Sequence, residues 1–173
     1  MIKQALYILI LTVVVSAVVN WVSPNQISWV GHYREVNLNR PKPVKPPEPD
    51  AGDPPYIDLD LAVFDHGSGQ GMFIDARDPD EFECGTIPGS LNVPFEHMPD
   101  VDDLTPYFDS ALGFPPRDQR LVVFCSGEDC DLSIHLSRNL QAVGYTNLAI
   151  FFGGFREWER WVGELERRRP CDE

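Results

Sequence analysis

No lysine occurs after Lys45 in this 173-residue sequence, and the chain as a whole is poor in positive charge. It contains 27 aspartate and glutamate residues against 14 lysine and arginine residues, so its formal net charge at pH 7 is −13. An acidic surface repels the phosphates of nucleic acids and the anionic headgroups of lipids. The composition therefore argues against nucleic acid as a partner.

Cysteine is also scarce, with only Cys84, Cys125, Cys130 and Cys171 in the whole chain. Their spacing fits neither a disulfide scaffold nor a two-pair zinc site, and the four histidines show no metal-ligand spacing. We therefore expect no metal and no cofactor. Only Cys125 and Cys130 form a local pair. Cys171 lies near a terminus that is expected to fray, so we assign no role to it or to Cys84.

The amino-terminal segment differs from the rest of the chain in its hydrophobicity. Residues 5–22 read ALYILILTVVVSAVVNWV and are uncharged and almost wholly apolar. A helix needs about 20 such residues to cross a bilayer, so residues 1–23 are predicted to form a transmembrane anchor. The alternative is a cleavable signal peptide with Val15, Ser16 and Ala17 at its cleavage site, but the apolar run continues past these residues.

The orientation of this anchor depends on a nearly balanced count of positive charges. Lys3 and the amino terminus lie on one side, and the other side carries Arg34, Arg40, Lys42 and Lys45. A very short amino-terminal tail most simply stays in the cytoplasm. In a bacterium we therefore expect a single-pass protein of the inner membrane whose domain faces the periplasm.

Residues 24–55 are predicted to link the anchor to a folded domain. The stretch 40–55, RPKPVKPPEPDAGDPP, is too rich in proline to pack as a helix or a sheet and is typical of a semi-rigid polyproline spacer. At ~3.1 Å per residue it can reach on the order of 50 Å. A docking peptide for a proline-reading partner is the alternative. The domain is predicted over residues 56–168, with a carboxyl-terminal tail over 169–173.

Strand and helix patterns alternate through the predicted domain. Short runs rich in β-branched and aromatic residues predict strands, and apolar residues three and four positions apart predict helices. Strands are predicted at 72–75, 91–93 and 121–124, with further short strands near Tyr56 and before Gly153; helices are predicted at 80–84, 98–113, after Asp131 and at 155–168. Such alternation predicts an α/β domain with a central, mainly parallel sheet flanked by helices.

Cys125 stands where an apolar strand ends and a short acidic loop begins. Asp131 is expected to cap the helix that follows the loop, and Gly144 is expected to end this helix. Loop amides and the positive end of the helix dipole favour a thiolate at Cys125. Glu128, Asp129 and Asp131 oppose this effect, because negative charge nearby raises the pKa of a thiol. The sequence leaves the acidity of Cys125 open.

Three segments between roughly residues 55 and 165 resemble the signature segments of the rhodanese superfamily. The family pattern is a strand followed by Asp-x-Arg, a Gly-His-Ile-Pro-Gly turn, a cysteine loop and a closing Gly-Gly-x-x-x-Trp. The matching residues are Asp75, Arg77, Gly85, Ile87, Pro88, Gly89, Cys125, Gly153, Gly154 and Trp158. The resemblance implies a single rhodanese-like domain, with the cysteine at the bottom of a loop cradle, and a sulfurtransferase that forms a persulfide on Cys125.

The sequence also departs from this family pattern. Thr86 replaces the usual histidine, which we interpret as a change in turn packing. Cys130 stands where many active members have an arginine that helps to hold thiosulfate. With Glu128 and Asp129 beside it, the loop disfavours thiosulfate, so a thiol or protein persulfide is the expected donor and a thiol or protein the expected acceptor. Phosphatase activity, known in relatives with a longer loop, is disfavoured because this loop has no arginine to bind phosphate.

The expected catalytic residues are Cys125 as nucleophile and Cys130 as a resolving thiol, which would release the sulfur and leave a disulfide between the two. The alternative for Cys130 is a small residue that fills the start of the helix. The expected substrate-binding residues are Ser126, Gly127, Glu128, Asp129, Asp131 and Arg77. Asp75 and Arg77 are also expected to tie the strand end to the neighbouring loop.

Two other functions stay open. The Cys125 and Cys130 pair is suited to thiol/disulfide exchange, particularly in an oxidising compartment. The other open function is that of a catalytically silent binding module, which presents its acidic loop to a partner.

Overall fold

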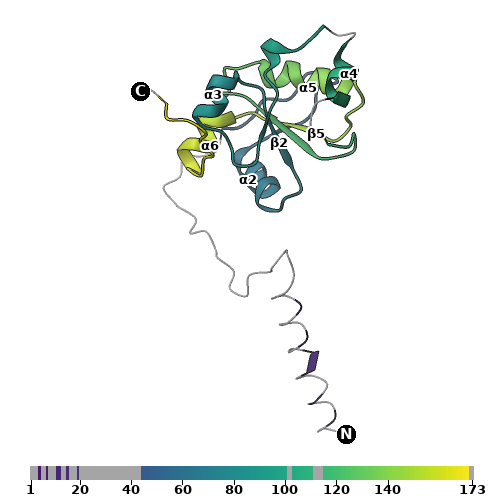
Figure 1. The fold of residues 1–173 in the computed structure, drawn as a ribbon, viewed down its shortest axis with the longest axis vertical. Coiled ribbons are helices and arrows are strands. Elements are labelled where there is room, and N and C mark those ends of the chain that lie inside the picture. The colour runs from purple at the N-terminus through teal and green to yellow at the C-terminus, as the bar shows by residue number, and fades with distance from the viewer. Residues whose placement is uncertain are drawn as a thin grey trace. The chain divides into compact units, whose positions relative to one another are not determined.

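Figure 1 shows the computed structural model, which describes residues 44–100, 103–110 and 115–171 together with six separate positions between 4 and 19. The chain divides into two compact units, Met1–Asn39 and Arg40–Glu173. The six described positions of the first unit have helical backbone. The rest of the predicted anchor over 1–23 lies outside the described residues. Within the described part of the chain, no helix combines the length and the apolar character needed to cross a membrane.

The second unit contains, among its described residues, a sheet of five parallel strands in the order β1-β5-β4-β2-β3. The strands are β1 (Tyr56–Ile57), β2 (Met72–Asp75), β3 (Leu91–Asn92), β4 (Leu121–Phe124) and β5 (Leu148–Phe151). This order places β4 at the centre of the sheet. The predicted α/β class with a central parallel sheet is confirmed.

Helices cover both faces of this sheet (Figure 1). They are α2 (Leu59–Gly67), α3 (Pro79–Cys84), the 3₁₀ helix η1 (Phe95–His97), α4 (Leu104–Ser110), α5 (Leu132–Ala142) and α6 (Gly154–Trp161). One hydrophobic cluster joins the sheet to α4 and α5, and a second joins it to α2 and α6. The sheet is therefore the middle layer of three.

Successive side chains of β4 belong alternately to these two clusters, as the two-residue period of a strand requires. Val122 and Phe124 pack with α2 and α6. Leu121 and Val123 pack with α4 and α5, and Cys125 continues their alternation on the same face. All four residues of β4 are buried, which explains why the strand is a continuous apolar run.

Two predicted helices differ from the helices that form. In the segment predicted at 98–113, the described residues contain α4 over Leu104–Ser110, and residues 101, 102 and 111–113 lie outside the described part. Met98 is extended, with ψ 148°, because the following proline disfavours a helical residue before it. The helix predicted at 155–168 ends at Trp161. Gly163 has a φ of +75° and donates its amide to the carbonyl of Trp158, which ends the helix with a left-handed residue.

The chain after α6 turns back along α3. Thr86 and Glu166 form an antiparallel bridge with two N–H···O contacts of 3.0 Å. The amides of Arg168 and Arg169 donate to the carbonyl of Glu83, at 2.9 and 3.2 Å. The carboxyl-terminal segment is thus held against α3 as far as Arg169, the first residue of the predicted tail.

The end of the predicted linker also contacts the domain. The amide of Val44 donates to Oε1 of Glu157 at 2.9 Å. Arg138 binds both carboxylate oxygens of Asp53, at 2.7 and 2.8 Å, and this pairing lowers the pKa of Asp53. The predicted spacer therefore touches the domain from Val44 onward.

Candidate active site

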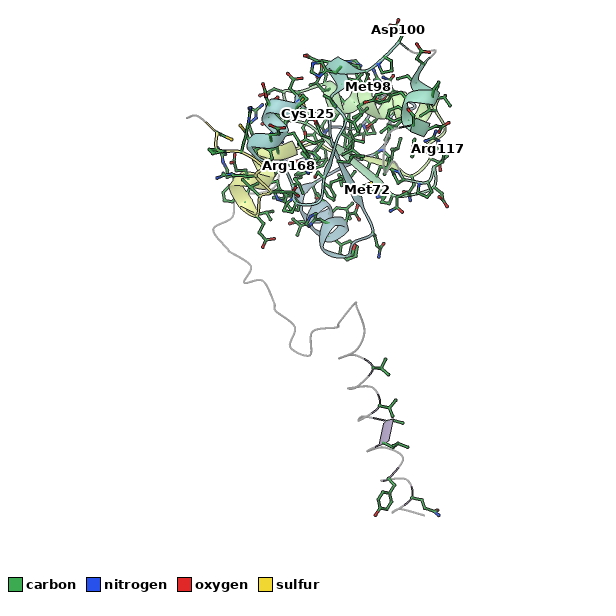
Figure 2. All side chains as sticks on the ribbon, in the orientation of Figure 1. Met72, Met98, Asp100, Arg117, Cys125 and Arg168 are labelled. Carbon is green, nitrogen blue, oxygen red and sulfur yellow. A yellow bond between two sulfur atoms is a disulfide. The ribbon has the colours of Figure 1, made fainter. Side chains whose placement is uncertain are left out.

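Cys125 lies immediately after β4, at the carboxyl edge of the central strand. Ligands of open parallel sheets bind at this edge, because the loops that follow the strands gather there. The side chain is nearly inaccessible, with 1% of the residue exposed, and Figure 2 places it among the packed side chains of the domain. The amide of Ala76 donates to the carbonyl of Phe124 at 2.9 Å, which fixes the end of β4 against β2.

The backbone of the cysteine loop, residues 125–130, is held by the first turn of α6. The amide of Phe155 donates to the carbonyl of Cys125 at 2.8 Å, and the amide of Arg156 donates to the carbonyl of Ser126 at 3.0 Å. Gly154 has a φ of +60°, and a Cβ atom there would lie 2.5 Å from the carbonyl oxygen of Cys125 and 2.8 Å from the amide of Gly127. Only glycine allows this approach.

The loop brings the two predicted catalytic residues together. A disulfide joins Cys125 to Cys130, and their Cα atoms are 6.3 Å apart, within the range that a disulfide spans. The amide of Cys130 donates to the carbonyl of Gly127 at 3.0 Å, which closes the loop on itself. Reduction of this disulfide would leave two thiols that can reach each other.

Asp131 precedes α5, but its side chain makes no capping hydrogen bond. Its backbone is already helical, with φ −85° and ψ −9°, whereas a capping residue is normally extended. Its carbonyl instead accepts from the amides of Ile134 and His135, at 3.0 and 3.1 Å. Asp131 therefore stands at the predicted N-cap position of α5, but its side chain does not make the expected capping hydrogen bond. At the other end of α5, Gly144 has a φ of +96°, as predicted for the residue that ends this helix.

Glu128 and Asp129 are exposed, as expected for an acidic loop, but arginines accompany them. Nη1 of Arg156 lies 3.6 Å from Oδ2 of Asp129. Arg156 and Arg160 line, together with Glu128, a cavity of about 220 Å³ beside the loop. Sequence reasoning missed these arginines, although the Gly-Gly pair that precedes Arg156 was the available signal.

Arg77 is buried and stabilises the fold through hydrogen bonds to its neighbours. Its guanidinium donates to both oxygens of Asp75, at 2.9 and 2.6 Å, and to the carbonyl of Gly85 at 2.8 Å. Thr86 donates its hydroxyl to the same carboxylate at 2.8 Å. The predicted tie between the strand end and the neighbouring turn is confirmed. The substrate-binding role of Arg77 stays a prediction.

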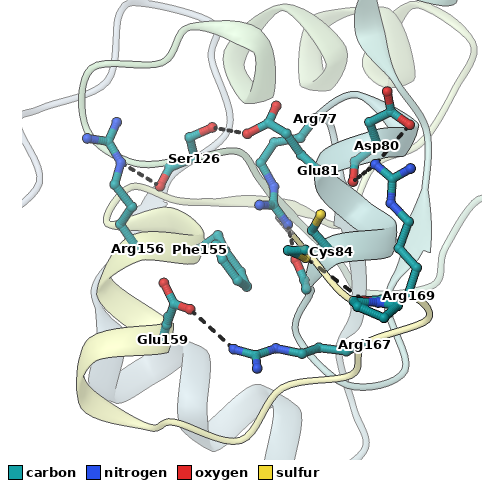
Figure 3. A pocket seen from close by; sticks show the side chains of 13 residues that line it. Arg77, Asp80, Glu81, Cys84, Ser126, Phe155, Arg156, Glu159, Arg167 and Arg169 are labelled. Atoms are coloured by element: carbon teal, nitrogen blue, oxygen red, sulfur yellow. Dashed lines mark hydrogen bonds and ion pairs between the residues drawn. The ribbon is translucent and has the colours of Figure 1, made fainter. Parts of the chain in front are cut away.

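Arg77 also borders a larger cavity of about 790 Å³, shown in Figure 3. Its guanidinium lies 4.0 Å from the ring centre of Phe155. Ser126 reaches this cavity from the cysteine loop and contacts Oε1 of Glu81 at 3.3 Å. The cavity therefore lies beside the loop, with Ser126 between it and Cys125.

Comparisons with known proteins agree with this geometry. The family model described as rhodanese-like domain matches residues 62–160. The human thiosulfate:glutathione sulfurtransferase is 33% identical over 96 residues, which cover 53% of this chain and 81% of that protein. The Saccharomyces cerevisiae protein of the same name is 30% identical, over 54% of this chain and 68% of that protein. The solved human single-domain sulfurtransferase is 25% identical with a TM-score of 0.51, over 62% of this chain and 96% of that one.

Replacing Gly154 by alanine should destabilise the domain more than the same change at Gly163. Both residues have positive φ, which costs alanine about 1–2 kcal/mol. Only at Gly154 does the new Cβ meet backbone closer than 3 Å, and overpacking of this kind adds about 1–3 kcal/mol. Urea unfolding of Gly154→Ala and Gly163→Ala measures the difference. Equal losses of unfolding free energy would show that α6 does not need close contact with the cysteine loop.

Proposed function

Because the chain belongs to the rhodanese-like domain family, we propose that it is a sulfurtransferase that carries sulfane sulfur as a persulfide on Cys125. The observation that carries this proposal is the position of Cys125 at the end of the central strand, in a loop whose backbone is fixed by α6. The family relatives described above are named sulfurtransferases, which supports the same activity here.

The reaction requires the reduced form of the cysteine loop. The Cys125 thiolate attacks the outer sulfur of a persulfide donor, RS–SH. The S–S bond of the donor breaks, the donor leaves as RSH after taking a proton, and Cys125 holds the transferred sulfur. An acceptor thiolate then attacks this outer sulfur, so the acceptor becomes a persulfide and Cys125 returns as a thiolate.

Cys130 offers a second outcome for the persulfide. Its thiolate can attack the inner sulfur, the Sγ atom of Cys125, which forms the Cys125–Cys130 disulfide and releases hydrosulfide. A dithiol reductant must then reduce the disulfide before another cycle begins, and is itself oxidised to a disulfide. The Cys125–Cys130 disulfide in the structure corresponds to the product of this attack by Cys130.

The charge of the loop supports a thiol or protein persulfide as donor in preference to thiosulfate. Glu128 and Asp129 repel a small dianion, and Cys130 occupies the loop position at which an arginine would bind it. Arg156 weakens this repulsion without abolishing it, because the ion pair with Asp129 is exposed and 3.6 Å long. Arg77 supplies no free charge, because Asp75 neutralises it.

Thiol/disulfide exchange is the second candidate, and the observed disulfide favours it. In that reaction the Cys125–Cys130 disulfide accepts two electrons from a partner dithiol, and the partner leaves as a disulfide. Sulfur transfer and disulfide exchange use the same two sulfur atoms. Mass spectrometry of the Cys130→Ser variant distinguishes them, because transfer still adds one sulfur to Cys125, whereas exchange through the cysteine pair cannot occur.

The role of Cys125 can be tested with serine variants of the full chain. Cys125→Ser should abolish sulfur loading from a persulfide donor, since serine keeps the volume of the side chain but lacks the thiolate. Cys130→Ser should retain loading and accumulate the persulfide, because the resolving attack is removed. The assay is sulfur transfer to a small thiol, with intact-mass analysis of the enzyme and circular dichroism as the control for folding. Undiminished transfer by a folded Cys125→Ser variant would disprove the proposed nucleophile.

The proposed donor preference predicts a gain of thiosulfate activity on reversing the loop charge. The triple variant Glu128→Gln, Asp129→Asn, Cys130→Arg should use thiosulfate at least ~10-fold better, about 1.4 kcal/mol of transition-state stabilisation. Much of the gain should disappear at high salt, because exposed charges are screened over roughly 10 Å at 0.1 M ionic strength. The variant Cys130→Ser is the control for loss of the thiol alone. No gain at low salt would mean that loop charge does not select the donor.

We further propose that residues 1–23 anchor the chain in the inner membrane with the domain on the periplasmic side. The uncharged apolar run over 5–22 supports a membrane anchor there. A reporter without cysteine, fused after Glu173, should behave as exported. Strong activity of a reporter that works only in the cytoplasm would reverse the orientation.

A further inference from the structure

The cavity of about 790 Å³ contains a second pair of cysteines that the proposed sulfur transfer does not use. Cys84 ends α3 and Cys171 belongs to the carboxyl-terminal segment, yet both line the cavity. Figure 3 shows Cys84 between the arginines that line the cavity. Both cysteines carry free thiols; Cys84 is partly exposed and Cys171 is exposed, so a small molecule can reach them.

The fold holds these two cysteines together although 87 positions separate them along the chain. The Thr86–Glu166 bridge and the hydrogen bonds from Arg168 and Arg169 to the carbonyl of Glu83 run along this part of α3. Arg169 adds contacts to the carboxylates of Asp80 and Glu83, at 3.0 and 3.7 Å. Cys171 follows this anchored segment by two residues.

Cys84 and Cys171 line the same cavity closely enough for their side chains to interact. The interaction with the Cys84 side chain raises the pKa of Cys171. The guanidinium of Arg169 also hydrogen-bonds Cys84. Cys84 is therefore the cysteine of the pair with two hydrogen-bonding groups beside its sulfur, which favours it as the attacking thiol.

Arginines and carboxylates both surround this pair. Arg77, Arg156, Arg167 and Arg169 line the cavity, against the three carboxylates Asp80, Glu81 and Glu159. Arg167 is the least constrained of these arginines, because its contact with Glu159 is 3.8 Å long and exposed. Because Asp75 neutralises Arg77, the other three arginines balance the three carboxylates. In a chain with a net charge of −13, this cavity is much less acidic than the whole, and Arg167 is placed to bind an anionic ligand.

We propose that Cys84 and Cys171 form a second dithiol site, which reduces small anionic disulfides bound in the arginine-lined cavity. The Cys84 thiolate attacks one sulfur of a disulfide R–S–S–R, forms a Cys84–S–S–R mixed disulfide and releases one R–S⁻. Cys171 then loses its proton and attacks the Sγ atom of Cys84, which forms the Cys84–Cys171 disulfide and releases the second R–S⁻. Two thiol groups are oxidised, one external disulfide is reduced, and the two protons pass to the released thiolates.

The test uses the full chain with Cys125→Ser and Cys130→Ser, so that sulfur transfer and the first disulfide are both removed. After reduction and exposure to oxidised glutathione as the anionic probe, this protein should lose two hydrogens and yield a Cys84–Cys171 linked peptide. Adding Cys171→Ser should trap glutathione on Cys84. The protein that carries Cys84→Ser instead should attach glutathione to Cys171 at least ~10-fold more slowly than the Cys171→Ser protein attaches it to Cys84. Absence of the linked peptide, or preferential attachment at Cys171, would overturn the proposal.

A separate pair of variants tests whether the arginines of the cavity favour anionic disulfides. Arg167→Gln should slow the reaction with oxidised glutathione about 5-fold and leave the reaction with the neutral probe 2-hydroxyethyl disulfide unchanged. Arg160→Gln is the matched control, because Arg160 lines the smaller cavity and is absent from the residues that line the larger one. Equal effects of the two substitutions, or equal effects on both probes, would show that the cavity does not select anionic disulfides.

Discussion

The contact between the first turn of α6 and the cysteine loop is the constraint on which the candidate site depends. Two amides at the start of α6 donate to the carbonyls of Cys125 and Ser126, and Gly154 allows the backbones to approach this closely. The loop is therefore positioned through its main chain. A loop held through its main chain depends less on the identity of its exposed side chains, so Cys130 can stand at the position where many active members of the family are expected to have arginine.

Charge around the site is set by tertiary structure as much as by the loop. The loop itself is acidic, with exposed carboxylates at Glu128 and Asp129. Helix α6 adds Arg156 and Arg160 on one side of it, and the returning carboxyl-terminal segment adds Arg167 and Arg169 to the neighbouring cavity. A ligand approaching the loop thus meets both signs of charge within a few residues. The net charge of −13 describes the whole chain and not this edge of the sheet.

The sequence predicted the parts of the structure that depend on local pattern. The apolar strands and the end of α5 at Gly144 follow from short-range preferences, and the proximity of Cys125 and Cys130 follows from the short loop between them. The helix over 155–168 was predicted too long, because the amphipathic pattern continues past Gly163 while its positive φ ends the helix.

What the sequence could not reveal depends on contacts between distant segments. The bridge between Thr86 and Glu166 joins residues 80 positions apart, and it makes the carboxyl-terminal segment one wall of a cavity. The spacing of apolar residues along the sequence does not predict a bridge between two such distant residues. The missing side-chain cap at Asp131 has a local origin, since the closed loop before α5 already holds this residue in a helical conformation.

The observed disulfide and the proposed persulfide exclude each other, because the Sγ atom of Cys125 can form only one further bond. Cys130 lies in the same closed loop, with its Cα 6.3 Å from that of Cys125, so its attack on the inner sulfur is intramolecular. Intramolecular reactions in good geometry have very high effective concentrations. An external acceptor must therefore take the outer sulfur before Cys130 attacks, which requires that it bind beside the loop rather than arrive by random collision. The two cavities that adjoin Ser126 and Glu128 are the places where such an acceptor can bind.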